Sequence, residues 1–194
     1  MTFADDGWRA DLERVDVAIY AAIAQTPTPS LDRAMARLSR AADHSKLSLL
    51  AAAALSATGS RRARRAAGLG LASVAATSGF VNLGLKPLGR RRRPDRAAME
   101  VPVARHVRMP VSTSFPSGHS AAAFAFATGV GRALPPAAIP LRALAAAVAY
   151  SRVHTGVHYP GDVVTGALVG TATAQVVTHA VSYTHLTLPT TSRV

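Results

Sequence analysis

A run of twenty uncharged residues, from Ala66 to Leu85, constrains the fold of this chain more than any other feature. As an α-helix, a segment of this length crosses the hydrocarbon core of a bilayer. Clusters of arginine flank the run, at Arg61–Arg65 before it and at Arg90–Arg96 after it. Small residues recur within it, as they do in helices that pack closely in lipid: Gly68, Gly70, Ser73, Ser78 and Gly79. This alternation of basic segment and apolar span is more typical of a membrane protein than of a DNA-binding protein.

The rest of the chain also has a helical pattern. Apolar residues make up 49% of the chain and aromatic residues 5%, and no segment alternates apolar and polar residues as a strand does. Further apolar helices are predicted at 47–59 (lengthened by 41–46), 117–134, 137–153 and 162–179. We therefore predict an all-α fold, a membrane-embedded helical bundle of about five core helices with short N-terminal interfacial helices. A soluble alanine-rich bundle is the alternative.

The chain divides into three parts. Residues 1–45 are predicted to form amphipathic helices at the membrane interface, because the apolar stretch Val15–Ile23 is too short to span a bilayer. Residues 46–180 are predicted to form the helical bundle. Residues 181–194 are predicted to be a non-native tail, because they back-translate readily to a sequencing adapter, and the natural chain is then expected to continue beyond residue 180. A natural polar tail is the alternative.

The composition limits the available chemistry. The chain has no cysteine, which excludes disulfides and thiolate-bound zinc. Its formal net charge of +12 favours an anionic partner: nucleic acid, an anionic membrane surface or a phosphate-bearing substrate. Aromatic residues that could stack on bases are not interleaved with the basic residues, so we expect no nucleic acid partner.

The basic clusters also predict an orientation in the membrane. If Arg61–Arg65 lies in the cytoplasm, loops 86–116 and 152–161 both face the outer side. Loop 86–116 is itself rich in arginine, although arginine-rich loops usually face the cytoplasm. This exception indicates that the arginines of the loop have a function. We expect a multi-pass protein of the plasma membrane with its active site facing the outer side.

Residues suited to phosphate chemistry gather in these two loops. Cleavage of a phosphate ester needs cations and amide donors around the phosphoryl oxygens, a nucleophile, and an acid for the leaving oxygen. Lys86, Arg93 and Arg152 can supply the cations. Ser117 and Gly118 open a predicted helix, and the N-terminus of a helix binds anions.

Two histidines can supply the reactive groups. His119 and His158 are candidates for the acid and the nucleophile. Asp162 can accept the hydrogen on one ring nitrogen of His158 and leave the other nitrogen free to attack. Each residue taken alone has a structural alternative, since Ser117 and Asp162 can cap helices and a single histidine is often structural. We interpret His154 as structural.

The candidate residues fall into three groups along the sequence, and together these groups resemble the signature motifs of the type 2 phosphatidic acid phosphatase (PAP2) superfamily. Lys86 to Pro94 resembles Lys-x6-Arg-Pro, Pro116 to His119 resembles Pro-Ser-Gly-His, and Ser151 to Asp162 resembles Ser-Arg-x5-His-x3-Asp. This resemblance implies a helical phosphatase with no metal and no cofactor. Residues 15–175 also resemble the amino-terminal half of actinobacterial proteins that join this phosphatase to a diacylglycerol-kinase-like domain, which implies a missing C-terminal kinase-like domain.

The resemblance implies a role for each candidate residue. His158 would form a phosphohistidine, Asp162 would orient it, and His119 would protonate the leaving oxygen and then activate water. The phosphate would be held by Lys86, Arg93, Ser117, Gly118 and Arg152. The implied reaction is hydrolysis of a phosphomonoester or pyrophosphate of a lipid, such as phosphatidic acid, phosphatidylglycerol phosphate or a polyprenyl phosphate. The alternatives are a vanadate-dependent haloperoxidase-like enzyme and a non-enzymatic basic membrane-binding protein.

Overall fold

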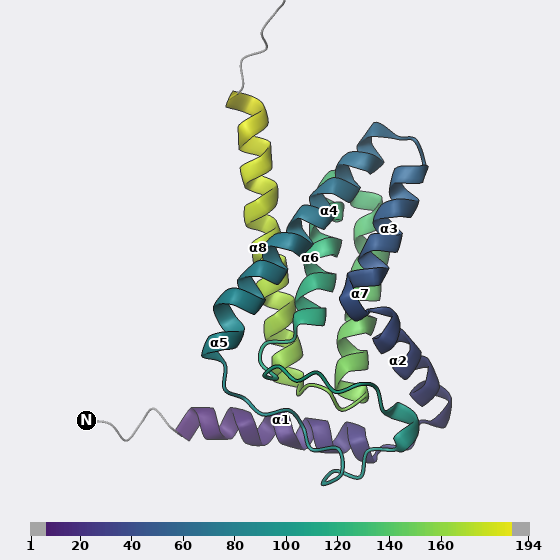
Figure 1. Ribbon diagram of the computed structural model, residues 1–194, viewed down its shortest axis with the longest axis vertical. Helices are drawn as coiled ribbons and strands as arrows, with labels where there is room; N and C mark the ends of the chain where they lie inside the picture. The colour runs from purple at the N-terminus through teal and green to yellow at the C-terminus, as the bar shows by residue number, and fades with distance from the viewer. Residues whose placement is uncertain (1–6, 188–194) are drawn as a thin grey trace, which may run out of the picture.

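A computed structural model describes residues 7–187, with side chains placed up to residue 182. Over these residues the chain forms helices and no strand (Figure 1), which confirms the predicted all-α fold. Five helices form the bundle, as predicted: α3 (Lys46–Ala57), α4 (Arg61–Gly79), α6 (Gly118–Ala133), α7 (Ala138–His154) and α8 (Pro160–Thr187). The predicted non-native tail begins within α8 and extends beyond the described residues, so its origin stays a prediction.

Two N-terminal helices precede the bundle, and short helical elements connect its helices. They are α1 (Gly7–Gln25), α2 (Pro29–Ala41), η1 (Asp43–Ser45), η2 (Phe80–Leu85), α5 (Lys86–Leu88), η3 (Val103–Arg105) and η4 (Pro135–Ala137). The connection between α5 and α6 is the long segment that contains η3. It lies at the same end of the bundle as α1 (Figure 1).

The helix α4 begins earlier than the predicted span. The hydroxyl of Ser60 accepts a hydrogen bond from the amide of Ala63 (3.4 Å) and caps the helix, so Arg61–Arg65 forms its first turn rather than a loop. The helix then continues through η2, which is π-helical, into α5. A π-helical turn contains more residues than an α-helical one and rotates the residues that follow it. It therefore helps to set the direction of Lys86.

Two helical segments are long and apolar enough to cross a membrane. They are Arg61–Leu88 and Pro160–Ser182, which contain 18-residue stretches with mean hydropathies of 1.4 and 1.2. The other bundle helices, α3, α6 and α7, have 12, 16 and 17 residues, fewer than the ~20 that an average span needs. The two long apolar helices indicate that the protein associates with membranes.

Helix α6 is the centre of the bundle and packs against α4, α7 and α8. Glycines bring the backbones of neighbouring helices into contact. A Cβ atom added to Gly129 of α6 would lie 2.6 Å from an atom of α4. On α8, a Cβ atom at Gly166 would lie 2.4 Å from the carbonyl oxygen of Ser117, and one at Gly170 only 2.0 Å from that of Ala121. These contacts are typical of small-residue interfaces between helices in lipid.

We expect Gly170→Ala to lower the free energy of unfolding by about 1–3 kcal/mol, because the added methyl group must push α8 away from α6. Gly68→Ala is the matched control. Gly68 has open space around it within α4, so alanine there should be neutral or stabilising by up to about 1 kcal/mol. The midpoint of thermal unfolding in detergent measures both effects. A Gly170→Ala variant as stable as the wild type would contradict the close approach of these two helices.

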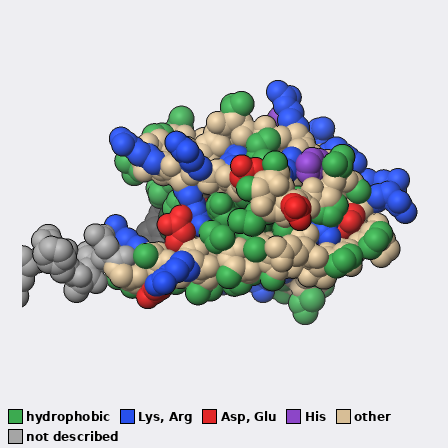
Figure 2. All heavy atoms as spheres, turned by 90° about the horizontal axis from the view of Figure 1, so that it is seen from below, with side chains coloured by type: hydrophobic (Ala, Val, Ile, Leu, Met, Phe, Trp, Pro, Cys, Tyr) green, Lys and Arg blue, Asp and Glu red, His purple; other side chains and the backbone are tan. Residues whose placement is uncertain are grey.

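The N-terminal helices cover the end of the bundle where the long loop lies. Helix α1 runs across this end, and α2 packs against α7 (Figure 1). Helix α1 is longer than the predicted stretch 15–23, and it buries Asp16 and Tyr20 while Trp8 and Leu12 are exposed. Figure 2 views this end and shows Lys and Arg side chains around its edge. The interfacial location of residues 1–45 stays a prediction.

Candidate active site

Three segments meet at the loop end of the bundle and bring the predicted site residues together. They are the long segment 89–117, the short turn 155–159 between α7 and α8, and η1 between α2 and α3. The predicted residues are linked there by side-chain or backbone contacts. They are Lys86, Arg93, Ser117, Gly118, His119, Arg152, His158 and Asp162.

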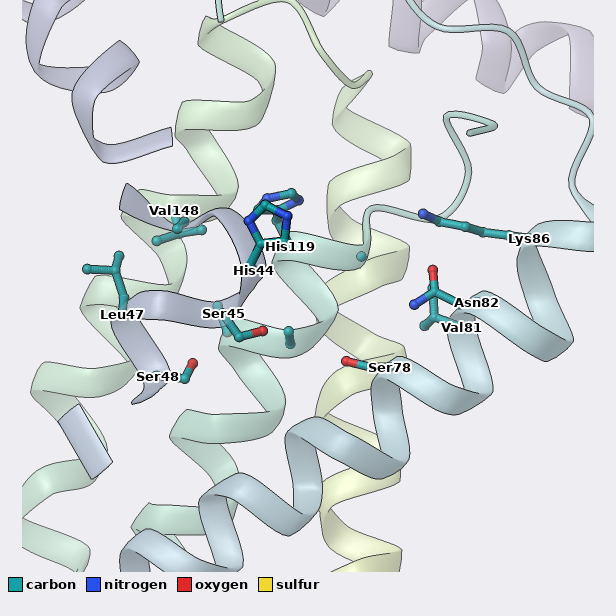
Figure 3. Close-up of a pocket in the computed structure, with 14 residues that line it drawn as sticks. His44, Ser45, Leu47, Ser48, Ser78, Val81, Asn82, Lys86, His119 and Val148 are labelled. Atoms are coloured by element: carbon teal, nitrogen blue, oxygen red, sulfur yellow. The ribbon is translucent and has the colours of Figure 1, made fainter. Parts of the chain in front are cut away.

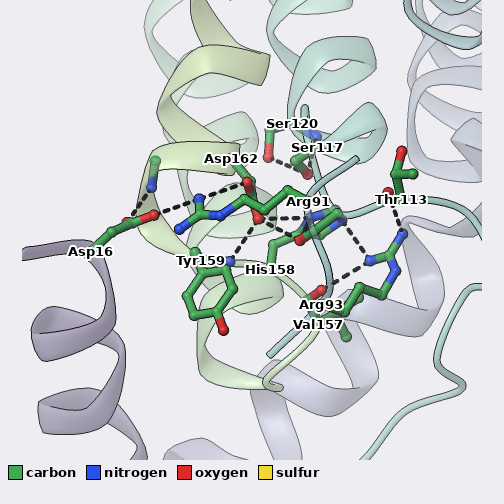
Figure 4. Close-up of polar contacts among 12 residues, drawn as sticks. Asp16, Arg91, Arg93, Thr113, Ser117, Ser120, Val157, His158, Tyr159 and Asp162 are labelled. Atoms are coloured by element: carbon green, nitrogen blue, oxygen red, sulfur yellow. Dashed lines mark hydrogen bonds and ion pairs between the residues drawn. The ribbon is translucent and has the colours of Figure 1, made fainter. Parts of the chain in front are cut away.

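His158 lies buried in the turn between α7 and α8 (Figure 4). Its Nε2 atom is 3.2 Å from Nη1 of Arg93. Its Nδ1 atom is 3.4 Å from the hydroxyl of Ser114 and 3.6 Å from Oδ2 of Asp162. Burial lowers the pKa of His158 to about 4, and the cations of Arg93 and Arg152 act in the same direction. The imidazole is therefore neutral at pH 7, and its Nε2 atom faces the guanidinium of Arg93.

Asp162 is fully buried in the first turn of α8. Its carboxylate accepts hydrogen bonds from the hydroxyl of Ser114 (2.5 Å), the amide of Tyr159 (2.9 Å) and Nη1 of Arg91 (3.0 Å). The helix starts at Pro160, a residue suited to the first helical position, so Asp162 reaches back to the amide just before the helix. Asp162 therefore caps the start of α8 and also lies next to His158, so the two interpretations of this residue are compatible.

Arg93 is fixed by backbone carbonyls around the site. Its guanidinium donates to the carbonyl oxygens of Ser112 (2.9 Å), Thr113 (3.2 Å) and Val157 (2.9 Å). The hydroxyl of Ser112 also accepts a hydrogen bond from Lys86 (3.1 Å). The two cations thus share one loop residue, Ser112, although Lys86 precedes the arginine cluster and Arg93 lies within it.

The N-terminus of α6 faces Lys86. Ser117 is buried and caps the helix, with its hydroxyl accepting from the amide of Ser120 (3.5 Å). A Cβ atom on Gly118 would lie 3.8 Å from the ammonium nitrogen of Lys86. An anion between them would be contacted by the ammonium group and by the free amides of the first helical turn.

His119 and Arg152 share an acidic neighbour, Asp43. The Nε2 atom of His119 is 2.9 Å from Oδ1 of Asp43, and Nη1 of Arg152 is 3.8 Å from the same oxygen. Arg152 is buried and also donates to the hydroxyl of Ser39 (2.6 Å). Asp43 is the first residue of η1, and the other two residues of η1, His44 (56°) and Ser45 (57°), have positive φ. This tight turn brings a carboxylate from the N-terminal part of the chain to the site.

Sequence reasoning missed the residues that support the predicted ones. Asp43 and Ser114 lie outside the three motifs, and Arg91 occupies a variable position of the first motif, so the motif pattern does not single out any of the three. Arg91 bridges Asp162 and Asp16 of α1, at 3.0 and 2.6 Å, and lies over the ring of Tyr159 at 4.2 Å (Figure 4). Helix α1, predicted as an interfacial helix, therefore contacts the site through a partly buried ion pair.

His154 lies away from this network. It is buried, and its Nε2 atom is 3.0 Å from Asp32, which also binds Arg105. These contacts support its interpretation as a structural histidine. Among the residues with described side chains, no three His, Asp or Glu groups gather as metal ligands would.

Residues 67–186 match the family model of the PAP2 superfamily. The chain therefore belongs to the PAP2 superfamily. A decaprenylphosphoryl-5-phosphoribose phosphatase of Mycolicibacterium smegmatis is 38% identical over 160 residues, which cover 79% of this chain and 80% of the relative. A protein of the same name from Mycobacterium tuberculosis is 39% identical over 97 residues, 48% of this chain. In that match the chain spans about half the length of the curated relative, 49%.

Two solved structures have the same fold. The PAP2-type phosphatidylglycerolphosphate phosphatase of Bacillus subtilis superposes with a TM-score of 0.70 and 25% identity, covering 89% of this chain and 87% of that one. LpxE of Aquifex aeolicus superposes with a TM-score of 0.66 and 24% identity, covering 84% and 94%. The helical bundle described above is thus the fold of membrane phosphatases of this superfamily.

Proposed function

We propose that this protein is a membrane lipid phosphatase that hydrolyses a phosphomonoester or pyrophosphate of a lipid through a phosphohistidine on His158. One observation carries the proposal. A buried, neutral imidazole has Nε2 beside the guanidinium of Arg93 and Nδ1 beside the Ser114–Asp162 pair. A phosphate that replaces the hydrogen bond between Arg93 and Nε2 of His158 would lie directly in front of that nitrogen.

The reaction has two steps. In the first, Nε2 of His158 attacks the phosphorus atom and the bond to the leaving oxygen breaks. Burial and the cation of Arg152 lower the pKa of His119 to about 4 in the protein without substrate, and the bound phosphate anion would raise that pKa again. His119, protonated in the complex, donates its proton to the leaving oxygen. Asp162 stabilises the positive charge that develops on the imidazole. In the second, His119 accepts a proton from water, the water oxygen attacks phosphorus, and the bond from nitrogen to phosphorus breaks. Phosphate leaves, and both histidines return to their starting states.

The phosphoryl oxygens would be bound by Lys86, Arg93, Arg152 and the first turn of α6. Arg152 supports this arrangement because its Nε atom is buried and has no hydrogen-bond partner among the described residues. Leaving a buried donor unpaired costs free energy, which a bound anion would recover. The cations would also stabilise the charge that grows on these oxygens in the transition state.

The substrate class is inferred from the relatives. Two of them are decaprenylphosphoryl-5-phosphoribose phosphatases by name, so we propose a phosphorylated lipid of the polyprenyl type. The test is release of phosphate by the purified protein from detergent micelles of polyprenyl-linked phosphosugar, phosphatidic acid and phosphatidylglycerol phosphate. We expect turnover in the presence of EDTA, with the polyprenyl-linked substrate preferred. Halide oxidation with added vanadate, without phosphate release from any lipid, would contradict the proposal.

The membrane topology is also a proposal. The bundle would be multi-pass in the plasma membrane, with the active site on the outer side and the basic start of α4 in the cytoplasm. A further kinase-like domain, expected after the C-terminal end of this chain, stays a prediction.

Because the chain has no cysteine, single introduced cysteines can report the topology. Val111 is exposed next to the site, and Ala57 is exposed at the opposite end of α3. We expect a membrane-impermeant maleimide to label Val111→Cys in intact cells, and Ala57→Cys only after permeabilisation. The reverse pattern would place the active site in the cytoplasm.

A further inference from the structure

Helix α1 contacts the turn that carries His158 on both sides of this residue. Before it in the chain, Gly156 has a positive φ (67°), and a Cβ atom added there would lie 2.8 Å from the hydroxyl oxygen of Tyr20. After it, the amide of Gly161 donates to Oδ1 of Asp16 (2.6 Å). Tyr20 is 1% exposed and Asp16 is 9% exposed. Because His158 lies between the two contacts, α1 restricts the movement of its backbone.

The contact with Gly161 is a helix cap supplied by a distant part of the chain. The amides of the first turn of a helix have no partner within that helix. At the start of α8, Asp162 accepts from the amide of Tyr159, and Asp16 accepts from the amide of Gly161. Asp16 precedes Gly161 by 145 positions. The end of α8 that contains Asp162 is therefore held by α1 as well as by its own residues.

Asp16 also shares a guanidinium with Asp162 (Figure 4). Nη1 of Arg91 is 2.6 Å from Oδ2 of Asp16 and 3.0 Å from Oδ1 of Asp162. A cation between two carboxylates neutralises each of them only in part. Without the charge of Asp16, Arg91 would act on Asp162 alone. Less negative charge would then remain to stabilise the positive charge that develops on His158 during attack.

Asp16 is separate from the residues proposed to touch the substrate. Lys86 and His119 line a cavity of about 240 Å³ beside the site (Figure 3), and α1 contributes no described residue to its lining. Helix α1 also lies outside residues 67–186, the part of the chain that matches the family model. Any effect of Asp16 on the reaction must therefore pass through Gly161 and Arg91.

We propose that Asp16 is a positioning residue of the reaction, which holds the His158–Asp162 pair through Gly161 and Arg91 and keeps the charge of Asp162 available to the imidazole. This inference rests on the proposed phosphatase function. It makes the N-terminal helix a part of the chain that the reaction needs, because the turn with the nucleophile is fixed against it.

The first test compares the binding of two small anions to the purified protein by calorimetry. Inorganic phosphate resembles the ground state, whereas orthovanadate takes up a fifth ligand, such as a histidine nitrogen, and then resembles the transition state. Asp16→Asn removes the carboxylate charge and keeps an oxygen that can accept from Gly161. We expect it to weaken vanadate binding about 10-fold, the order of one charge–charge interaction near a protein surface, and phosphate binding by less than about 2-fold.

The kinetics of lipid hydrolysis should show the same separation. Asp16→Asn should lower kcat about 10-fold and leave KM within about 2-fold, because the lost interaction acts only when the imidazole becomes positively charged. Asp11→Asn is the matched control. Asp11 is an exposed aspartate of α1 that pairs with Arg14, so its variant should change neither the kinetics nor the binding of either anion.

Two results would overturn the proposal. Equal weakening of both anions by Asp16→Asn would assign it a structural role alone, and unchanged binding of both would assign it none. If this variant does not fold, Gly161→Ala gives the same comparison. A Cβ atom there would lie 3.0 Å from Oδ2 of Asp16 and would push the carboxylate aside, so vanadate binding should again weaken more than phosphate binding.

The anion measurements also separate this inference from the function on which it rests. If the wild type hydrolysed no lipid, the phosphatase proposal would fail, and the two binding constants would still decide the role of Asp16. If the wild type bound neither anion, both proposals would be overturned.

Discussion

His158→Gln should lower the rate of phosphate release by at least about 10⁴-fold, the order of loss seen when a catalytic nucleophile is removed. Glutamine fills a similar volume and can hydrogen-bond, but its amide nitrogen has no free electron pair for attack on phosphorus. The rate is measured as phosphate released from a lipid substrate in detergent. Brief incubation of the wild type with radiolabelled substrate should leave an acid-labile, alkali-stable phosphate on the protein, and the variant should show none.

His106→Gln is the control for this substitution. His106 is exposed and bonds only the carbonyl oxygen of Val101 (3.0 Å), so the variant should keep near-normal turnover. Because His158 is buried, the thermal midpoint of its variant must be measured in parallel. A folded His158→Gln protein that still turns over lipid phosphate at a tenth of the wild-type rate would exclude this histidine as the nucleophile.

Arg105→Met should destabilise the protein by about 3–5 kcal/mol, the usual cost of removing one partner of a buried ion pair. Arg105 is completely buried, and its Nε donates to Asp32 (2.8 Å). Its two terminal nitrogens donate to carbonyl oxygens at the end of α1, those of Ile23 (2.9 Å), Ala24 (3.2 Å) and Thr26 (2.6 Å). The substitution removes the arginine partner of these oxygens, and the Asp32 carboxylate keeps only its contacts with Thr28 and His154 among the described residues. Thermal or denaturant unfolding measures the loss.

Two further variants make this prediction specific. Arg108→Met removes an exposed arginine from the same loop and should change stability by less than about 0.5 kcal/mol. Asp32→Leu added to Arg105→Met should recover part of the loss, because it removes the unpaired buried charge. If Arg105→Met were no more destabilising than Arg108→Met, the buried network would not hold α1 and α2 in place.

Much of the candidate site could be predicted because its reactive residues occur in short contiguous motifs. The four residues Pro116 to His119 include a helix cap, a glycine and a histidine. Their arrangement is local, because it depends on neighbouring residues at the start of one helix. The supporting residues could not be predicted in this way. Asp43 reaches His119 across 76 positions, and Ser114 reaches Asp162 across 48. Such contacts depend on the path of the whole chain.

The helix boundaries show the same division. The uncharged run 66–85 identified a helix that is long and apolar enough to cross a membrane, but the helix starts at Arg61 because Ser60 caps it there. Helix α8 starts at Pro160, two residues before the predicted boundary at 162, because proline is favourable in the first turn. Caps and first-turn residues depend on one or two side chains, which periodicity does not detect.

The sequence by itself determined the helical, membrane-associated character of this protein, because the side chains of a long uncharged run must be kept away from water. It also determined which residues have reactive side chains. Tertiary structure alone decided how they are used. It buried His158 and lowered its pKa to about 4, directed one ring nitrogen to Arg93, and brought Asp43 and α1 to the site. The physical reason is that burial and charge pairing arise from segments that are far apart in the chain and meet only in the folded bundle.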